Sequence, residues 1–231
     1  MKKRALRKDF YMEIRKSLGR FLSIFFIVAM GVAFFSGIRA SEPDLRYSGD
    51  AYFDRNHLMD LKVMGTLGLT ENDVQAIRSL EGVAQAEPGY SADVMVERDG
   101  NQKVLHVSSI LDSMNQYTVE EGRMPKKDGE CLIDQDFIQG SDLKVGDEIT
   151  LISGTKDPVT DTFTKETFRI VGAGSSPEYI SFHRGSSMIG NGEVSGFLAV
   201  PKESFVTEAY TECYVSVEGA EEKTAFTEEY D

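Results

Sequence analysis

The sequence predicts an α+β protein in which one N-terminal transmembrane helix is followed by a mixed α/β extracytoplasmic domain with a β-rich lobe. Three observations lead to this prediction. Residues 21–38 (FLSIFFIVAMGVAFFSGI) form an uncharged apolar run between Arg20 and Arg39. The net charge changes sign across this run. Beyond it, one amphipathic helical stretch stands among many short apolar stretches that are separated by turn residues.

The apolar run is long enough to cross a bilayer. Its eighteen residues reach about 27 Å as a helix, close to the roughly 30 Å hydrocarbon core. A buried core helix is the alternative, but the length of the run and its lack of charge both oppose it. We therefore expect a cytoplasmic basic lead-in over residues 1–20, the transmembrane helix over 21–40, a partly helical stalk over 41–60 and the extracytoplasmic core domain over 61–231.

Charge predicts the orientation of this helix. Residues 1–20 carry eight basic and two acidic residues, a net of +6, so the rest of the −13 chain carries −19. Basic flanks remain in the cytoplasm and attract anionic lipid, so we expect residues 41–231 outside a bacterial cell membrane. A cleaved signal peptide is the rival interpretation, although the run exceeds a typical signal-peptide core and Ile38-Arg39-Ala40 fits a cleavage site poorly.

Two patterns near the membrane indicate contacts beyond anchoring. Ala29, Ala33 and Gly37 recur at every fourth position and form a small-residue face for another membrane helix, although ordinary membrane composition also produces this spacing. The lead-in has an apolar stripe that predicts an interfacial helix on the cytoplasmic leaflet, with a simple stop-transfer flank as the alternative. The stripe consists of Phe10, Ile14, Leu18 and Phe21.

The extracytoplasmic part has the composition of a folded domain, because 27% of the chain is charged and 41% apolar. Thr70 is expected to cap a helix at the Asp73 N–H, and Gly82 to end it. The apolar face of this helix would contain Val74, Ile77 and Leu80.

Short extended stretches are expected through the rest of the domain, and they favour a small barrel or sandwich lobe. These stretches are 61–64, 83–84, 94–97, 104–107, 129–134, 143–151, 168–171, 197–200 and 213–217. Turns are expected at Pro88-Gly89, 99–101 and Gly146-Asp147, and Gly172 is expected to end the strand 168–171. Residues 220–230 resemble the start of a helix in which the sequence stops, which suggests a truncated chain.

No enzyme signature is present in the sequence. It contains no G-x-S-x-G, Walker A, H-E-x-x-H or dinucleotide motif, so we assign no catalytic, cofactor-binding or metal-binding residue and expect a non-enzymatic protein. His57, His106 and His183 lack the spacing of zinc ligands, and His106 is expected on a strand surface. Cys131 and Cys213 are expected to be buried free thiols, with one disulfide as the alternative. The acidic domain argues against nucleic acid as a partner.

Residues 175–196 are glycine-rich, have little periodicity and exceed most connections in length. We expect either a functional loop or a segment that a partner orders. Its polar cluster is the candidate contact site for a partner or cargo, and comprises Ser176, Pro177, Glu178 and Tyr179.

Several segments, in this order, resemble a known family: IRKSLGRFLSIFFIVAMGVAFFSGIRASEPD, LTENDVQAIRSLEGV, EGRMPKKDGECLID, LKVGDEITL, FRIVGAGSSPEYIS and RGSSMIGNGEVSGFLAV. Together they resemble the permease subunit of ABC transporters of the FtsX-like / MacB-like family, from about Arg15 to about Val217. The resemblance implies the first transmembrane helix plus an α+β core domain of two lobes. It also implies at least three further membrane helices toward the C-terminus.

By this resemblance, a cytoplasmic ABC ATPase subunit supplies the energy, and the membrane helices transmit its movement to the outer domain. That domain would handle lipid, peptide or antibiotic cargo, or signal to a partner. The implied partners are the ATPase, further transmembrane helices of the same chain or a second permease, and the lipid bilayer. Two alternatives remain: a single-span membrane-anchored binding or sensor protein, which the early stop opposes, and a secreted protein, which the poor cleavage site opposes.

Overall fold

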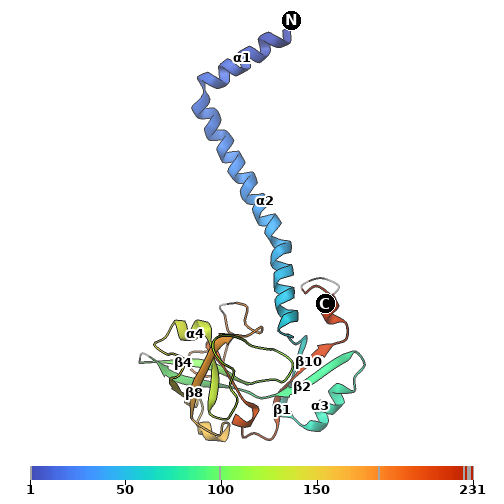
Figure 1. Cartoon of the computed structure of the whole chain (residues 1–231), viewed down its shortest axis with the longest axis vertical. Coiled ribbons are helices and arrows are strands. Elements are labelled where there is room, and N and C mark those ends of the chain that lie inside the picture. The colour runs from blue at the N-terminus through green and yellow to red at the C-terminus, as the bar shows by residue number, and fades with distance from the viewer. Residues whose placement is uncertain (1, 99, 182, 226, 228–229, 231) are drawn as a thin grey trace. The chain divides into compact units, whose positions relative to one another are not determined.

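The computed structural model describes residues 2–98, 100–181, 183–225, 227 and 230, apart from the side chains of residues 2–6, 14 and 98. The chain forms two compact units, Met1–Gly49 and Asp50–Asp231. It has an apolar N-terminal helix and a strand-rich domain with short helices (Figure 1). The predicted α+β class is confirmed.

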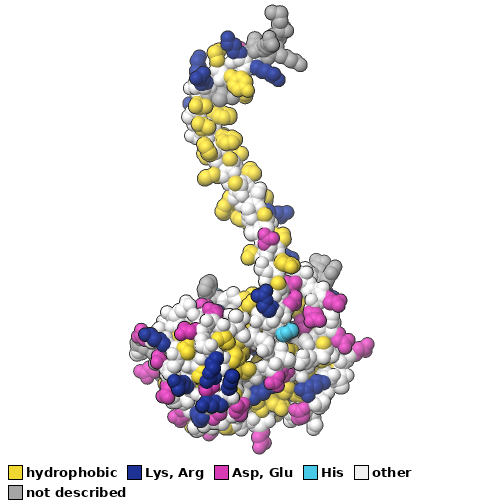
Figure 2. Space-filling view, viewed as in Figure 1, with side chains coloured by type: hydrophobic (Ala, Val, Ile, Leu, Met, Phe, Trp, Pro, Cys, Tyr) yellow, Lys and Arg dark blue, Asp and Glu magenta, His cyan; other side chains and the backbone are white. Residues whose placement is uncertain are grey.

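The first unit is helical. Ser17 alone separates α1 (Lys2–Lys16) from α2 (Leu18–Arg55). α2 extends beyond the predicted span into the stretch expected to be a stalk, where Glu42 and Arg46 form an ion pair of 3.0 Å one turn apart. Figure 2 shows apolar side chains along this unit's part of α2 and Lys and Arg side chains on α1. Within the described residues, α2 is the one helix long and apolar enough to cross a membrane.

A three-stranded antiparallel sheet begins the second unit. Its order is β1 (Leu61–Leu69), β10 (Tyr210–Val217) and β2 (Val83–Gly89). α3 (Glu71–Arg78) packs on it through Val74, which has no exposed surface. The predicted cap of α3 is confirmed: Thr70 Oγ1 accepts from the Asp73 N–H at 3.4 Å, and the Asp73 carboxylate accepts from the Thr70 N–H at 2.8 Å.

The larger sheet has seven strands. They are β3 (Ser91–Arg98), β4 (Asn101–Ser109), β5 (Thr118–Gly122), β6 (Glu130–Asp134), β7 (Glu148–Thr150), β8 (Thr167–Ser175) and β9 (Val194–Val200). Their order is β3-β4-β9-β6-β8-β5, and β7 pairs with the start of β8. The pairs β4–β9 and β6–β8 are parallel.

The path of these strands closes on itself, as expected for a small barrel. Met95 on β3 and Ile152, just beyond β7, exchange two backbone hydrogen bonds of 2.8 and 2.7 Å. The enclosed core includes Leu105, Ile133 and Phe168, which have no exposed surface. Short helices complete the domain: α4 (Gln135–Gln139) and the 3-10 turns η1 (Val159–Asp161), η2 (Lys202–Ser204) and η3 (Ala220–Glu222).

Two glycine-based predictions were wrong for the same physical reason. Pro88-Gly89 belongs to β2 rather than to a turn, and Gly172 continues β8 rather than ending it. A Cβ on Gly89 would lie 2.7 Å from the Tyr214 ring, and one on Gly172 would lie 2.4 Å from the Arg123 carbonyl oxygen. Both glycines permit close packing across strands instead of providing a turn.

Two predicted helices are shorter in the structure than the sequence indicated. Leu80 lies beyond α3 and is 60% exposed, because the helix ends at Arg78 rather than near Gly82. The helix expected over 220–230 is reduced to η3, since Lys223 is extended and the Ala225 N–H donates to the Asp50 carboxylate at 2.6 Å. Residues 226, 228 and 229 of that expectation lie outside the described residues.

Candidate functional site

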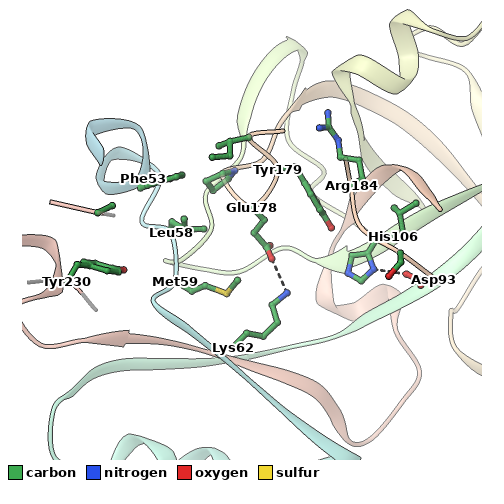
Figure 3. Close-up of a pocket in the computed structure, with 15 residues that line it drawn as sticks. Phe53, Leu58, Met59, Lys62, Asp93, His106, Glu178, Tyr179, Arg184 and Tyr230 are labelled. Atoms are coloured by element: carbon green, nitrogen blue, oxygen red, sulfur yellow. Dashed lines mark hydrogen bonds and ion pairs between the residues drawn. The ribbon is translucent and has the colours of Figure 1, made fainter. Parts of the chain in front are cut away.

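The second unit contains a cavity of about 680 Å³. Its walls come from the end of α2 and the following connection, from β1, β3, β4 and β9, from the glycine-rich loop between β8 and β9, and from the C-terminal segment (Figure 3). The lining residues are Phe53, Leu58, Met59, Lys62, Asp93, His106, Pro177, Glu178, Tyr179, Ile180, Arg184, Ser186, Val194, Ala225 and Tyr230. Its volume is in the range of small-molecule sites.

The polar cluster predicted from the sequence lies at this cavity. Pro177, Glu178 and Tyr179 line it. Ser176 is only 2% exposed, and its hydroxyl accepts a hydrogen bond from the Glu178 N–H at 3.3 Å. Ser176 therefore shapes the loop, and the three following residues face the cavity.

Lys62 and Glu178 of the lining form a charged triad with Glu212, which is not part of the lining. Lys62 Nζ lies 2.9 Å from Glu178 Oε2 and 3.3 Å from Glu212 Oε2 (Figure 3 shows the first contact). Glu212 also accepts from the Tyr214 hydroxyl at 2.6 Å, and Asn115 Nδ2 donates to Glu178 at 3.3 Å. Burial by itself would lower the pKa of the Lys62 ammonium, but the two carboxylates outweigh burial and raise it. Lys62 therefore stays charged.

An aromatic stack supports the loop above this triad. The rings of Tyr179 and Phe197 are stacked with centroids 5.5 Å apart, and Tyr117 lies 5.7 Å from Phe197 on another side. The Tyr117 hydroxyl and Ser108 Oγ form a hydrogen bond of 2.9 Å. Burial, with the nearby Glu178 charge, raises the pKa values of Tyr117 and Tyr179. Both phenols are therefore neutral hydrogen-bonding groups.

The opposite wall contains a hydrogen-bonded chain of three side chains. His106 Nδ1 lies 2.7 Å from Asp93 Oδ1, and Ser187 Oγ donates to Asp93 Oδ2 at 2.6 Å. Burial by itself would raise the pKa of the Asp93 carboxyl, but its bonds to His106 and Ser187 lower it. Because the ionised carboxylate can only accept, His106 Nδ1 carries the proton.

Arg184 fastens the glycine-rich loop to the end of β6. Its side chain is 8% exposed and bonds Asp134 through Nε at 2.7 Å and through Nη2 at 3.2 Å. Nη2 also donates to Asp136 at 2.6 Å. These bonds raise the pKa of the Arg184 guanidinium, which outweighs the opposing effect of its burial. The loop that was predicted from its glycine content is therefore held by a buried ion pair.

Most of the cavity's charged groups were not predicted from the sequence. One signal was available: Asp93 and His106 are directly opposite in the β3–β4 hairpin, whose turn was predicted. Lys62 and Tyr214 are also cross-strand partners, but β1 and β10 are far apart in the sequence. That pairing could not be inferred from local patterns.

The remaining predicted residues lie elsewhere. Ala33 and Gly37 are exposed on α2 and Ala29 is partly exposed, which leaves their role in helix packing a prediction. Phe10 (64%), Leu18 (47%) and Phe21 (45%) are exposed, and the side chain of Ile14 lies outside the described residues. Their interfacial role also stays a prediction.

The thiol prediction is confirmed, because Cys131 and Cys213 are both buried and free. Among the described residues, no group of three or more His, Cys, Asp or Glu side chains could hold a metal ion.

Comparison with protein families identifies the domain. The model of the MacB-like periplasmic core domain matches residues 18–230, which include both α2 and the strand-rich unit. The chain belongs to this family. It therefore corresponds to the N-terminal part of a MacB-like ABC transporter permease, as the sequence resemblance indicated. The comparison with curated proteins found no match.

Solved structures similar to this MacB-like core domain include one extracellular domain, one periplasmic region and one further permease domain. The extracellular domain of the noncanonic ABC-type transporter YknZ from Gram-positive bacteria is 13% identical, with a TM-score of 0.41 over 67% of this chain and 75% of that one. The periplasmic region of MacB from Actinobacillus actinomycetemcomitans is 11% identical, with a TM-score of 0.39 over 67% and 66%. A domain of a putative permease protein from Porphyromonas gingivalis is 14% identical, with a TM-score of 0.35 over 65% and 63%.

Proposed function

We propose that this MacB-like chain is part of a membrane-embedded permease subunit that couples a cytoplasmic ABC ATPase to an extracytoplasmic domain. The observation that carries the proposal is the family match over residues 18–230, because it joins the apolar helix and the strand-rich domain in one unit of homology. In this arrangement α2 crosses the bacterial cell membrane, the N-terminus is cytoplasmic and residues 41–231 are outside.

Charge supports this orientation. The first 20 residues carry a net charge of +6 and the remainder −19, and Lys- and Arg-rich flanks are retained in the cytoplasm. α1 would lie on the inner leaflet beside the ATPase, with Phe10 toward the lipid and its basic residues at the headgroups.

Contacts between membrane helices would transmit the movement of the ATPase to the extracytoplasmic domain. Ala29, Ala33 and Gly37 would contact another membrane helix, either of the same full-length permease or of a second copy. Gly31 lies on the opposite side of α2 and provides a matched control. Among the described residues, a Cβ on Gly31 or on Gly37 meets no atom within 4 Å apart from the neighbouring backbone of its own helix. In the assembled transporter, Gly37→Leu should uncouple ATP hydrolysis from the outer domain, and Gly31→Leu should not. Equal effects of the two variants would contradict the packing face.

The outer domain handles cargo or relays a signal in this proposal and is not itself an enzyme. Lipid, peptide and antibiotic cargo are the classes that the family resemblance suggests. The cavity of about 680 Å³ is the place where such a ligand would bind. The ATPase partner supplies the nucleotide site, because no Walker A motif occurs in this sequence.

A single-span membrane-anchored binding or sensor protein is the second candidate, since the cavity could work without an ATPase. Reading the coding sequence beyond Asp231 separates the two. Three or more further apolar spans of about 20 residues are expected for the permease. A stop codon at that point would remove the transmission path and leave the second candidate.

A further inference from the structure

α2 contains a proline in its interior. It is one continuous helix in the structure, although Pro43 lies within it (Figure 1). Pro43 has no N–H, so the Arg39 carbonyl cannot receive the usual hydrogen bond from the residue four positions later. The proline ring also crowds this carbonyl, and sharp bends of helices occur at such positions. The continuous form of α2 is therefore weakest between Arg39 and Pro43.

The residues around Pro43 have the sequence of a helix start. Ser41-Glu42-Pro43-Asp44 begins with a residue that can cap a helix and has an acidic residue three positions later. Both carboxylates of the tetrapeptide would lie in the first turn, where negative charge is favourable. The first four N–H groups of a helix have no partner within the helix, so a proline there removes no hydrogen bond. The tetrapeptide is thus better suited to begin a helix than to continue one.

The same arrangement begins α3. Residues 70–73 (TEND) hold a hydroxyl residue, a glutamate and an aspartate at the positions that residues 41–44 (SEPD) repeat. Thr70 Oγ1 accepts from the Asp73 N–H at 3.4 Å, and the Asp73 carboxylate accepts from the Thr70 N–H at 2.8 Å. The chain therefore already uses this motif as a reciprocal cap at a helix start.

Ser41 does not act as a cap while α2 is continuous. Its Oγ donates to the Ile38 carbonyl at 2.9 Å, a bond that is typical of a serine inside a helix and favours bending. Among the residues that the structure describes, no hydrogen bond joins the Ser41 side chain to Asp44. The ion pair of Glu42 and Arg46 lies after Ser41, so it would persist whether α2 is continuous or broken there.

Little packing opposes a break at this position. Residues 41–48 are exposed, and no residue of α2 is buried. A short helical segment without a packed face is marginal in water, whereas lipid would stabilise the helix over residues 21–38. The stretch between these two segments is therefore the place where α2 can change its conformation at least cost.

We infer that residues 39–44 form a joint that switches α2 between two states. In one state α2 is continuous and Ser41 bonds the Ile38 carbonyl. In the other, one helix ends near Arg39 and a second begins at Ser41, with Ser41 and Asp44 capping each other. The inference rests on the proposed function for its meaning, because a permease would transmit movement through the continuous form and absorb it at the joint. The switch itself needs only the residues of α2.

The backbone of Ser41 reports the two states. It is helical in the continuous form and extended in the capped form, so the ¹³C chemical shift of its Cα differs between them. Ala40-Ser41 is the only Ala-Ser pair in the sequence, so ¹³C-alanine and ¹³C,¹⁵N-serine labelling isolates its signal in solid-state NMR. The full chain in phosphatidylcholine nanodiscs should show both shifts, or one shift averaged between them.

Variants assign the switch to these residues. Pro43→Ala removes the obstacle to a continuous helix and should lower the ratio of capped to continuous α2 by about a hundredfold. Asp44→Ala removes half of the reciprocal cap and should lower this ratio a few-fold. Asp54→Ala, at an exposed aspartate of α2 outside the tetrapeptide, is the matched control and should leave the Ser41 signal unchanged. Circular dichroism of each variant verifies the fold.

The inference is overturned if the wild type shows the helical shift alone or the extended shift alone. It is also overturned if Pro43→Ala moves the Ser41 signal and Asp44→Ala does not, because α2 then has a simple proline bend without a capped state. The measurement requires neither ATP nor an ATPase. A chain that shows both states but has no further membrane spans would therefore keep this inference and lose the proposed permease function.

Discussion

Replacing Lys62 with Met should destabilise the domain, because Lys62 is the cation shared by Glu178 and Glu212. The substitution keeps much of the side-chain volume but leaves Glu178 and Glu212, whose side chains are 13% and 3% exposed, without their shared cation. Removing one partner of a buried ion pair costs about 3–5 kcal/mol. Because the Lys62 side chain is 26% exposed, solvent screening reduces the expected loss to about 2–4 kcal/mol.

The assay is thermal unfolding of the full chain followed by circular dichroism. A loss of this size should lower Tm by roughly 5–15 °C for a domain of this length. Lys156→Met, at an exposed lysine in the turn-rich link, is the control and should shift Tm by no more than about 2 °C. Equal Tm values for the two variants would refute the idea that the triad is a buried charge network.

The structure also predicts how the difference in unfolding free energy between wild type and Lys62→Met depends on pH. The pKa of Lys62 is raised above its ordinary value of 10.5, so its contribution is fully present below that pH and is lost as the pH rises through the folded-state pKa. The gap in unfolding free energy between wild type and Lys62→Met should therefore stay constant from pH 6 to about 9 and narrow above about 10.5. A gap that narrows already near neutral pH would contradict the assignment.

Three further outcomes follow from other parts of the domain. Gly172→Ala should destabilise the domain by about 1–3 kcal/mol, since the added Cβ would collide with backbone atoms of a neighbouring strand. Gly140→Ala is the control and should fold normally, because its Cβ would have no contact closer than 3.4 Å. Equal chemical denaturation midpoints for the two variants would contradict this reasoning. The hydrogen bonds from Arg123 and the Lys126 N–H lower the pKa of Glu130 to about 2. The contribution of Glu130 to the stability of the domain should therefore be lost as the pH falls from about 4.5 to about 2. A Glu130→Gln variant lacks this titration and should show a flatter acid-unfolding profile than the wild type. Burial raises the pKa of Cys131 and Cys213, so a maleimide should label them only after unfolding, and labelling of the native domain would disprove their burial.

Local sequence signals predicted those elements whose causes are local. The length and charge exclusion of the apolar run predict a helix in lipid. The cap at Thr70 and the β3–β4 hairpin depend on residues close together in the chain, and both are present. The closed strand path follows from many short strands with short connections, although its closing contact, Met95 with Ile152, joins distant positions.

Tertiary contacts decided the cases in which the same reasoning failed. Pro88-Gly89 has turn chemistry, yet pairing with β10 keeps it extended and the Tyr214 ring occupies the space beside Gly89. The candidate loop could be located from its glycines and its length. The ion pair that holds it, between Arg184 and Asp134, joins residues fifty positions apart in the sequence and could not be predicted from local patterns. The triad of Lys62, Glu178 and Glu212 depends on the pairing of β1 with β10, which no local pattern encodes.

The most direct test of the proposed arrangement is cysteine labelling in intact cells. Both native thiols are buried, so single cysteines can be introduced at Leu67, which is 97% exposed on the strand-rich domain, and at Tyr11, which is 72% exposed on α1. A membrane-impermeant maleimide should label Leu67→Cys in intact cells and Tyr11→Cys only after the membrane is permeabilised. Labelling of Tyr11→Cys but not Leu67→Cys in intact cells would contradict an extracytoplasmic domain anchored by a helix whose N-terminus is cytoplasmic.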